Sequence, residues 1–146
     1  MQWGGKFTQL YTIASQIAKE RSLKIAVITL SNRRKPVDYL LNHITPREFV
    51  KLIGQASLVV TNSFHGTCFS IIGKTPFVSV EYASNSERAK ALLEKCGLKH
   101  RLILADSFLG KEVYGVEDIV QAQECIINEV SESWEWFKGA INGVEG

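Results

Sequence analysis

The sequence of 146 residues predicts a three-layer α/β/α fold with a mostly parallel sheet. Three observations lead to this prediction. Short apolar runs alternate with stretches whose apolar residues recur at helical spacing, which is the pattern of a parallel sheet covered by helices. The run at residues 23–30, LKIAVITL, is almost wholly apolar, as in a strand covered on both faces. Residues 45–48, TPRE, form a complete helix start between two apolar stretches.

The first elements follow from spacing and capping. Apolar residues three or four apart predict a helix over residues 7–21, which is followed by the strand at 23–30. A polar connection is expected over residues 31–42. The next helix should begin at 45–48, because a threonine N-cap, a proline at the first helical position and a glutamate two residues later all favour a helix start; it should end near Ala56.

The remaining elements alternate in the same way. They are a strand at 57–62, a helix at 66–73, a strand at 76–82, a helix opened by a capping box at Ser84 and Glu87 and ended by Gly97, a short strand at 101–104, and a last helix that starts at 115–118. A Rossmann-like unit normally opens on a strand, whereas this pattern opens on a helix. We therefore expect residues 1–146 to form a single Rossmann-like domain that is a portion of a larger protein.

Composition excludes several classes of protein. The formal net charge is +2 and the only basic run, at 33–35, is interpreted as a solvated loop, so no nucleic-acid partner is expected. Cys68, Cys96 and Cys125 contain no C-x-x-C pair and have no metal-ligand spacing with the histidines; we expect reduced, mostly buried thiols and no metal site. No run approaches the length of a membrane span, and no signal peptide is recognisable, so a cytoplasmic location is expected.

The most informative segment is 59–82, VVTNSFHGTCFSIIGKTPFVSVEY. A strand runs into a polar turn at 61–63, and His65-Gly66 and a short helix follow. Such a turn lies at the carboxyl edge of a parallel sheet, where ligands bind. The helix start offers unpaired N–H groups and the positive end of a dipole, which suit a phosphate or a carboxylate. From the pattern alone, His65 is either a proton carrier or a hydrogen-bonding residue of the turn.

The stretch ITPREFVKLIGQASLVVTNSFHGTCFSIIGKTPFVSV resembles the polysaccharide pyruvyl transferase family, and residues 85–101 are similar to the segment that follows it in many members. The specific part is Asn62-Ser63-Phe64-His65-Gly66 in its strand–helix setting. The resemblance implies that the enolpyruvyl carbons of phosphoenolpyruvate are transferred to two hydroxyls of a sugar as a ketal, with release of phosphate. It also implies two Rossmann-like domains in a GT-B-type arrangement. This chain would be the C-terminal, donor-binding half, with the N-terminal acceptor domain absent.

The resemblance and the chemistry of the donor give the candidate residues. His65 is the expected catalytic residue, either as the acid that protonates the enol carbon or as a charge that stabilises the leaving phosphate. The expected substrate-binding residues are Asn62, Ser63, Gly66, Thr67, Glu81 and Arg88. Some members carry an arginine where Phe64 stands here, so Arg88 is the candidate for a guanidinium supplied from elsewhere. Apart from phosphoenolpyruvate as donor and a saccharide as acceptor, no cofactor is implied.

Each candidate has a structural alternative. Ser63 is a possible helix cap, Asn62 a turn former, Glu81 a strand end and Arg88 a solvated side chain. Arg101 has acidic residues as possible partners, and Cys68 is interpreted as a core residue whose pKa the helix start would lower.

Two other functions and an interface also remain open. The same turn would serve a GT-B-type nucleotide-sugar transferase, and a fold of this kind is also compatible with a non-catalytic interaction module. The aromatic end of the last helix, with Trp134, either packs on the domain or forms an interface with a second copy or with a separate N-terminal domain.

Overall fold

The computed structural model describes residues 5–29, 37–81, 87–104 and 111–142. The helices and strands alternate as the sequence predicts. In chain order they are α1 (Gly5–Arg21), β1 (Ala26–Ile28), β2 (Tyr39–Leu41), α2 (Pro46–Gln55), β3 (Val59–Thr61), α3 (Phe64–Ile72), β4 (Phe77–Glu81), α4 (Glu87–Lys95), β5 (Leu102–Leu104) and α5 (Glu117–Asn142), with 3-10 turns η1 (Lys99–Arg101) and η2 (Lys111–Tyr114). No helix within these ranges is long and apolar enough to cross a membrane.

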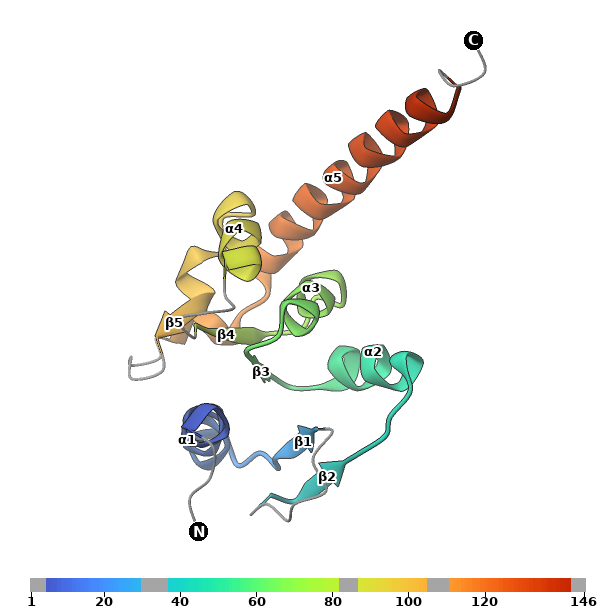
Figure 1. The fold of residues 1–146 in the computed structure, drawn as a ribbon. Coiled ribbons are helices and arrows are strands. Elements are labelled where there is room, and N and C mark those ends of the chain that lie inside the picture. Colours follow the sequence, from blue (N-terminus) through green and yellow to red (C-terminus); the bar gives the residue numbers. More distant parts are fainter. Residues whose placement is uncertain (1–4, 30–36, 82–86, 105–110, 143–146) are drawn as a thin grey trace.

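The strands form two parallel groups (Figure 1). β3, β4 and β5 make a three-stranded sheet in that order, and β1 pairs with β2. In the larger sheet Val59 is opposite Phe77, and Ser79 is opposite Leu102. Every strand pair in the described residues is parallel, which confirms the predicted α/β class with a parallel sheet.

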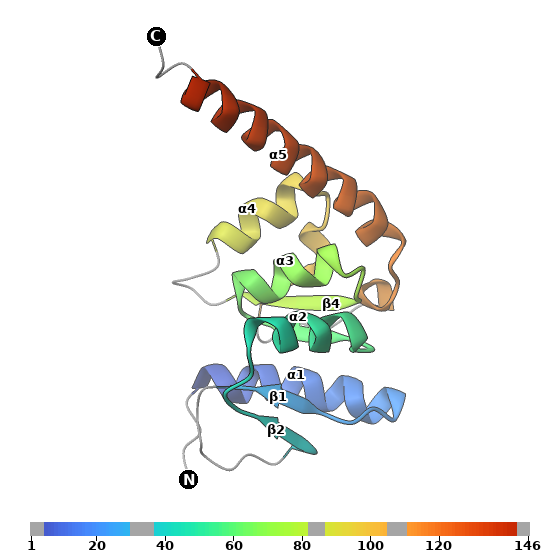
Figure 2. The same ribbon diagram turned by 90° about the vertical axis from the view of Figure 1, so that its right-hand side faces the viewer.

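β4 is the centre of the fold because helices cover both of its faces. Successive side chains of a strand point to opposite faces. Val78 and Val80 pack with Ile13 and Ile17 of α1. Phe77 points the other way, into a cluster of side chains from α3, α4 and α5. Figure 2 shows α1 on one side of β4 and these three helices on the other. The three-layer arrangement predicted from sequence is therefore confirmed.

Local signals set two helix ends as predicted. At the start of α2, the Thr45 hydroxyl accepts a hydrogen bond from the Glu48 N–H at 3.2 Å, and the Glu48 carboxylate accepts one from the Thr45 N–H at 2.7 Å. This reciprocal pair satisfies two donors of the helix start. Beyond α4, Gly97 has a φ of +72°, the left-handed conformation that commonly follows a helix. The capping serine predicted at Ser84 lies outside the described residues.

Three predictions were wrong. The polar connection at 31–42 contains the strand β2, and part of this connection, including the basic run at 33–35, lies outside the described residues. β1 is three residues long and its Ala26 and Ile28 are exposed, so it is not covered on both faces. The three cysteines are free but only half-buried. An apolar run indicates that a segment tends to be buried. Which neighbours cover it, and how completely, is set by the tertiary fold.

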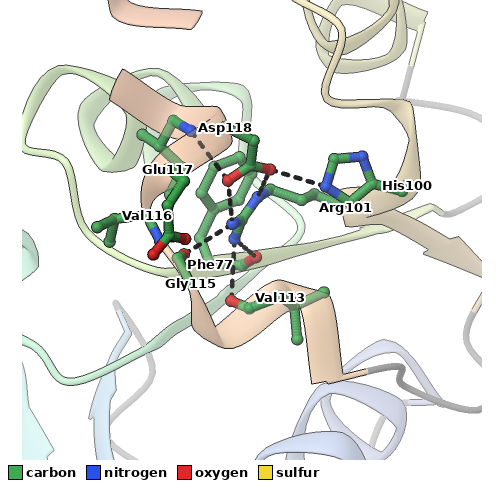
Figure 3. A network of polar contacts seen from close by, with 9 residues as sticks. Phe77, His100, Arg101, Val113, Gly115, Val116, Glu117 and Asp118 are labelled. Atoms are coloured by element: carbon green, nitrogen blue, oxygen red, sulfur yellow. Dashed lines mark hydrogen bonds and ion pairs between the residues drawn. The ribbon is translucent and has the colours of Figure 1, made fainter. Parts of the chain in front are cut away.

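The amino ends of β4 and β5 are joined through one buried guanidinium (Figure 3). Arg101 is fully buried, and its Nε and Nη2 donate to the two carboxylate oxygens of Asp118 at 2.8 and 2.7 Å. The remaining donors reach carbonyl oxygens of Phe77, Val113 and Gly115 at 2.8 to 3.1 Å. All five guanidinium N–H groups thus have acceptors within the protein. Arg101 therefore pairs with an acid, the structural alternative identified from sequence.

Candidate functional site

The β3–α3 junction positions His65 on a helix rather than in a loop. Ser63 is the N-cap of α3 and has an extended backbone, with φ −97° and ψ 133°. Its hydroxyl accepts from the Gly66 N–H at 3.5 Å, a long contact. The helix begins at Phe64, two residues earlier than the sequence suggested. His65 consequently lies in the first turn, where backbone N–H groups have no acceptor within the helix.

Thr61 explains the glycine in the motif. Its hydroxyl accepts from the Ser63 N–H at 3.0 Å and so fixes the turn. A Cβ atom at Gly66 would lie 2.3 Å from the same Thr61 oxygen. Glycine is needed at position 66, which the sequence predicted as a substrate-binding residue, because the helix packs against the end of β3. Sequence reasoning missed Thr61 as a positioning residue. A hydroxyl-bearing residue that ends a strand two positions before a serine N-cap is the signal that could have identified it.

Thr67 supports the turn from inside. It is fully buried, and its hydroxyl donates to the Ser63 carbonyl at 3.2 Å and lies 3.1 Å from the Ser79 hydroxyl on β4. One turn along, Ser70 donates to the Gly66 carbonyl at 2.7 Å. The Thr67–Ser79 contact joins the start of α3 to β4 at the centre of the sheet, and the Ser70 bond stabilises the first turns of the helix. The Thr67 side chain thus lies behind the surface on which the exposed site residues lie.

Phe64 brings Arg88 to the start of α3. The Arg88 guanidinium carbon lies 5.2 Å from the centre of the Phe64 ring, within the range of a cation–π contact. The Phe64 and His65 rings are 5.9 Å apart with an interplanar angle of 73°. Because Arg88 and Phe64 both belong to first helical turns, the positive ends of α3 and α4 lie near each other. The structure therefore gathers a cation, an imidazole and helix-start N–H groups from two helices.

The other candidates lie on the same edge of the sheet. The Asn62 and Ser63 side chains are exposed directly before α3, and those of His65 and Arg88 are exposed on the two helices. Glu81 is the last residue of β4, half-buried and opposite Leu104 of β5. Tyr82, its neighbour in the sequence, lies outside the described residues. The Arg101 network lies at the opposite, amino edge, so the candidate site and the main buried ion pair are separated by the length of the strands.

Cys68 is a free, half-buried cysteine of α3. Partial burial raises the pKa of the Cys68 thiol, against a smaller lowering by a backbone hydrogen bond. This is the reverse of the lowering expected at a helix start, because desolvation disfavours the thiolate more than the backbone stabilises it. Cys68 is therefore a packing residue. Within the described ranges, no group of three or more histidine, cysteine, aspartate or glutamate residues could hold a metal ion.

One comparison with known proteins gives a match. The family model for "Polysaccharide pyruvyl transferase" matches residues 6–85, which is more than half of the chain. The matched range runs from the second residue of α1 through β4, contains the turn with His65, and ends before Arg88. No curated protein and no solved structure gave a significant match.

Proposed function

The chain belongs to the polysaccharide pyruvyl transferase family, and we propose that it binds phosphoenolpyruvate at the start of α3 and takes part in transferring its pyruvyl group to a saccharide. The observation that carries this proposal is the Arg88 guanidinium, which lies 5.2 Å from the Phe64 ring centre, beside His65. Phosphoenolpyruvate carries a phosphate and a carboxylate on a small frame, so its site needs a cation and oriented N–H groups close together.

Each candidate residue has a part in this proposal. Arg88 pairs with one anionic group of the donor, in the place of the arginine that some relatives carry within the motif. The first-turn N–H groups of α3 hold the other group, and the Ser63 hydroxyl can donate to it while still accepting from Gly66. Asn62 donates from the adjoining turn, and Glu81 contacts the donor or acceptor from the end of β4. Thr67 keeps the turn in place from behind.

His65 acts on the enol in this proposal. Its imidazolium gives a proton to the methylene carbon of phosphoenolpyruvate, which leaves an oxocarbenium-like centre at the neighbouring carbon. One sugar hydroxyl attacks that carbon and returns its proton to the now neutral imidazole. The carbon–oxygen bond to the phosphate then breaks, its electron pair leaves with the phosphate, and a second oxocarbenium-like centre forms. The second hydroxyl attacks this centre, closes the ketal and passes its proton to the released phosphate. In the other role that we consider, the imidazolium stabilises the charge of the departing phosphate.

The reaction also needs a second surface that binds the acceptor sugar. We propose that residues 1–146 form one Rossmann-like domain and that a second domain, facing the α3 start as in a GT-B-type arrangement, holds the sugar and excludes water. The setting that we propose is the synthesis of exopolysaccharide or cell-envelope glycans in the cytoplasm.

Ligand binding to the chain tests the donor site. We expect phosphoenolpyruvate to raise the melting temperature, and a nucleotide diphosphate sugar and inorganic phosphate to have smaller effects. Arg88→Gln should weaken phosphoenolpyruvate binding about tenfold or more, because a charged hydrogen bond contributes roughly 1.5–3 kcal/mol. Lys51→Gln, which removes an exposed cation from the middle of α2, is the matched control and should bind normally. Stronger stabilisation by the nucleotide sugar would favour a glycosyltransferase, and no stabilisation by any ligand would favour an interaction module.

Turnover tests His65. In the protein with its acceptor domain, His65→Gln should keep most of the phosphoenolpyruvate affinity and lose transfer by about two to four orders of magnitude, the usual contribution of general acid catalysis. Transfer is measured as phosphate release that depends on the saccharide acceptor. A folded His65→Gln protein with near-normal transfer would exclude both catalytic roles.

A further inference from the structure

α5 carries two apolar stripes, and only one of them packs on the domain. Ile119 and Ala122 are buried in the cluster on the helical side of β4, with Ile126 against it. A second set of side chains, Val120, Ile127, Val130 and Trp134, is exposed by 43, 58, 63 and 58%. Figures 1 and 2 both show α5 continuing past α4 and away from the sheet. The packing of the aromatic end on the domain, one of the two sequence interpretations, is therefore not what the structure shows.

The exposed stripe has the spacing of a helix-pairing seam. Val120, Ile127 and Trp134 are seven residues apart, and Val130 lies between the last two, three residues after Ile127. The sequence continues the same spacing at positions 137 and 141, which are phenylalanine and isoleucine. From position 127 to 141 the apolar residues recur at alternating steps of three and four, the a and d positions of a coiled coil, which another helix covers. Between Val120 and Ile127 the d position is Gln123, whose side chain donates to the Ile72 carbonyl at 2.8 Å. A shallow hollow lies along this stripe, lined by Glu129, Val130, Ser133 and Trp134.

The charges on α5 decide which helix fits this seam. Glu129, Glu132 and Glu135 lie outside the positions that flank it, so they would not face each other across a pair. The positions that border the seam on one side, called e in a coiled coil, hold Glu124, Ser131 and Lys138. In an antiparallel pair of identical helices, each e position faces the e position equidistant from the centre. Glu124 of one copy therefore faces Lys138 of the other, and this happens twice.

We propose that two copies of this chain pair through α5 in an antiparallel arrangement centred near Ser131. In this register Trp134 of each copy packs against Val130 of the other, a large side chain against a small one. Lys138 already contacts Glu135 of its own helix at 2.5 Å, and its three donors allow a second acceptor across the pair. The oppositely directed helix dipoles also attract.

The antiparallel arrangement fits the rest of the molecule. The globular part of each copy lies at the amino end of α5, so antiparallel helices place the two globular parts at opposite ends of the pair. Parallel helices would place them at the same end and would separate Glu124 from Lys138. α5 starts beside the Arg101 network at the amino edge of the sheet, and the candidate site lies at the carboxyl edge. Pairing through the exposed end of α5 therefore leaves the start of α3 open.

Sedimentation equilibrium of the full chain tests the pairing. The wild-type protein should be a dimer whose dissociation follows mass action over about a hundredfold range of concentration. Trp134→Glu should be monomeric, since it places a charge in the apolar seam. Trp136→Glu is the control: Trp136 is 75% exposed and lies off the seam, so this variant should remain a dimer. Circular dichroism melts should show the same folded domain in all three proteins.

A charge exchange tests the direction of the helices. Glu124→Lys and Lys138→Glu should each weaken the dimer about tenfold, because each creates two like-charged contacts. The double variant Glu124→Lys/Lys138→Glu should recover most of the wild-type affinity. A monomeric wild-type protein, or a dimer that Trp134→Glu leaves intact, would overturn the proposal. Single variants without effect, or a double variant without recovery, would overturn the antiparallel register.

Discussion

Two arginines of this chain have different physical roles because one is buried and the other is exposed. Arg101 has all its donors bound to Asp118 and to carbonyl oxygens, so it has no capacity left for a ligand. Arg88 lies over the Phe64 ring, a contact that restrains the guanidinium and leaves its N–H edges available. The sequence alone does not separate the two, since burial arises only when distant segments come together.

Gly66 gives a prediction at the scale of one residue. Gly66→Ala should destabilise the protein by about 1–3 kcal/mol, because the added Cβ would meet the Thr61 hydroxyl oxygen at 2.3 Å and Thr61 is β-branched and held by Ser63. Urea unfolding gives the free energy. Gly139→Ala is the control, since a Cβ there meets nothing within 4 Å, and it should stabilise α5 by up to about 1 kcal/mol. Equal effects of the two substitutions would contradict the packing at the turn.

At the scale of an element, local signals were reliable and burial was not. The start of α2 follows from four adjacent residues, whose hydrogen bonds are the ones that the capping box predicts. β2 was missed because Tyr39–Leu41 follows a polar stretch and obtains its hydrogen bonds from β1, which is distant in sequence. On α5 the apolar spacing predicted a helix but did not separate the side chains that pack on the rest of the molecule from those that stay exposed.

Thr45→Ala tests the start of α2. Removal of the hydroxyl leaves the Glu48 N–H without its acceptor and should cost about 1 kcal/mol of unfolding free energy. Thr12→Ala is matched to it: Thr12 is an exposed threonine in the middle of α1 that donates to the Thr8 carbonyl, and its loss should change stability by less than about 0.5 kcal/mol. A Thr45→Ala protein as stable as Thr12→Ala would show that the cap contributes little.

At the scale of the whole molecule, the Asp118 carboxylate links α5 to the amino edge of the sheet through Arg101. Partial burial acts to raise the pKa of Asp118, but the hydrogen bonds and charge of Arg101, with a smaller contribution from His100, outweigh it and lower the pKa below its ordinary value of 3.8. A carboxyl whose pKa is lowered by folding stabilises the protein above its unfolded pKa. That stabilisation is lost as the pH falls from about 3.8 through the lower folded value.

Asp118→Asn should therefore lower stability at neutral pH by about 3 kcal/mol, since it leaves the buried Arg101 without its counter-charge. The difference from wild type should shrink as the pH falls below about 4. Unfolding free energies measured by urea at several pH values give this difference. Glu117→Gln, at the exposed neighbouring carboxyl, should show neither effect. A difference in unfolding free energy between Asp118→Asn and wild type that does not change with pH would contradict the link between the lowered pKa of Asp118 and stability.

The sequence by itself determined the α/β class, the order of most elements, the start of α2 and the family, because periodicity, capping and the His65 motif are local or strictly ordered along the chain. The tertiary structure alone decided that Arg101 is buried and that Arg88 lies over Phe64. It also decided which stripe of α5 is exposed. These are contacts between segments far apart in sequence, and a side chain becomes a support, a site residue or an interface according to what packs against it.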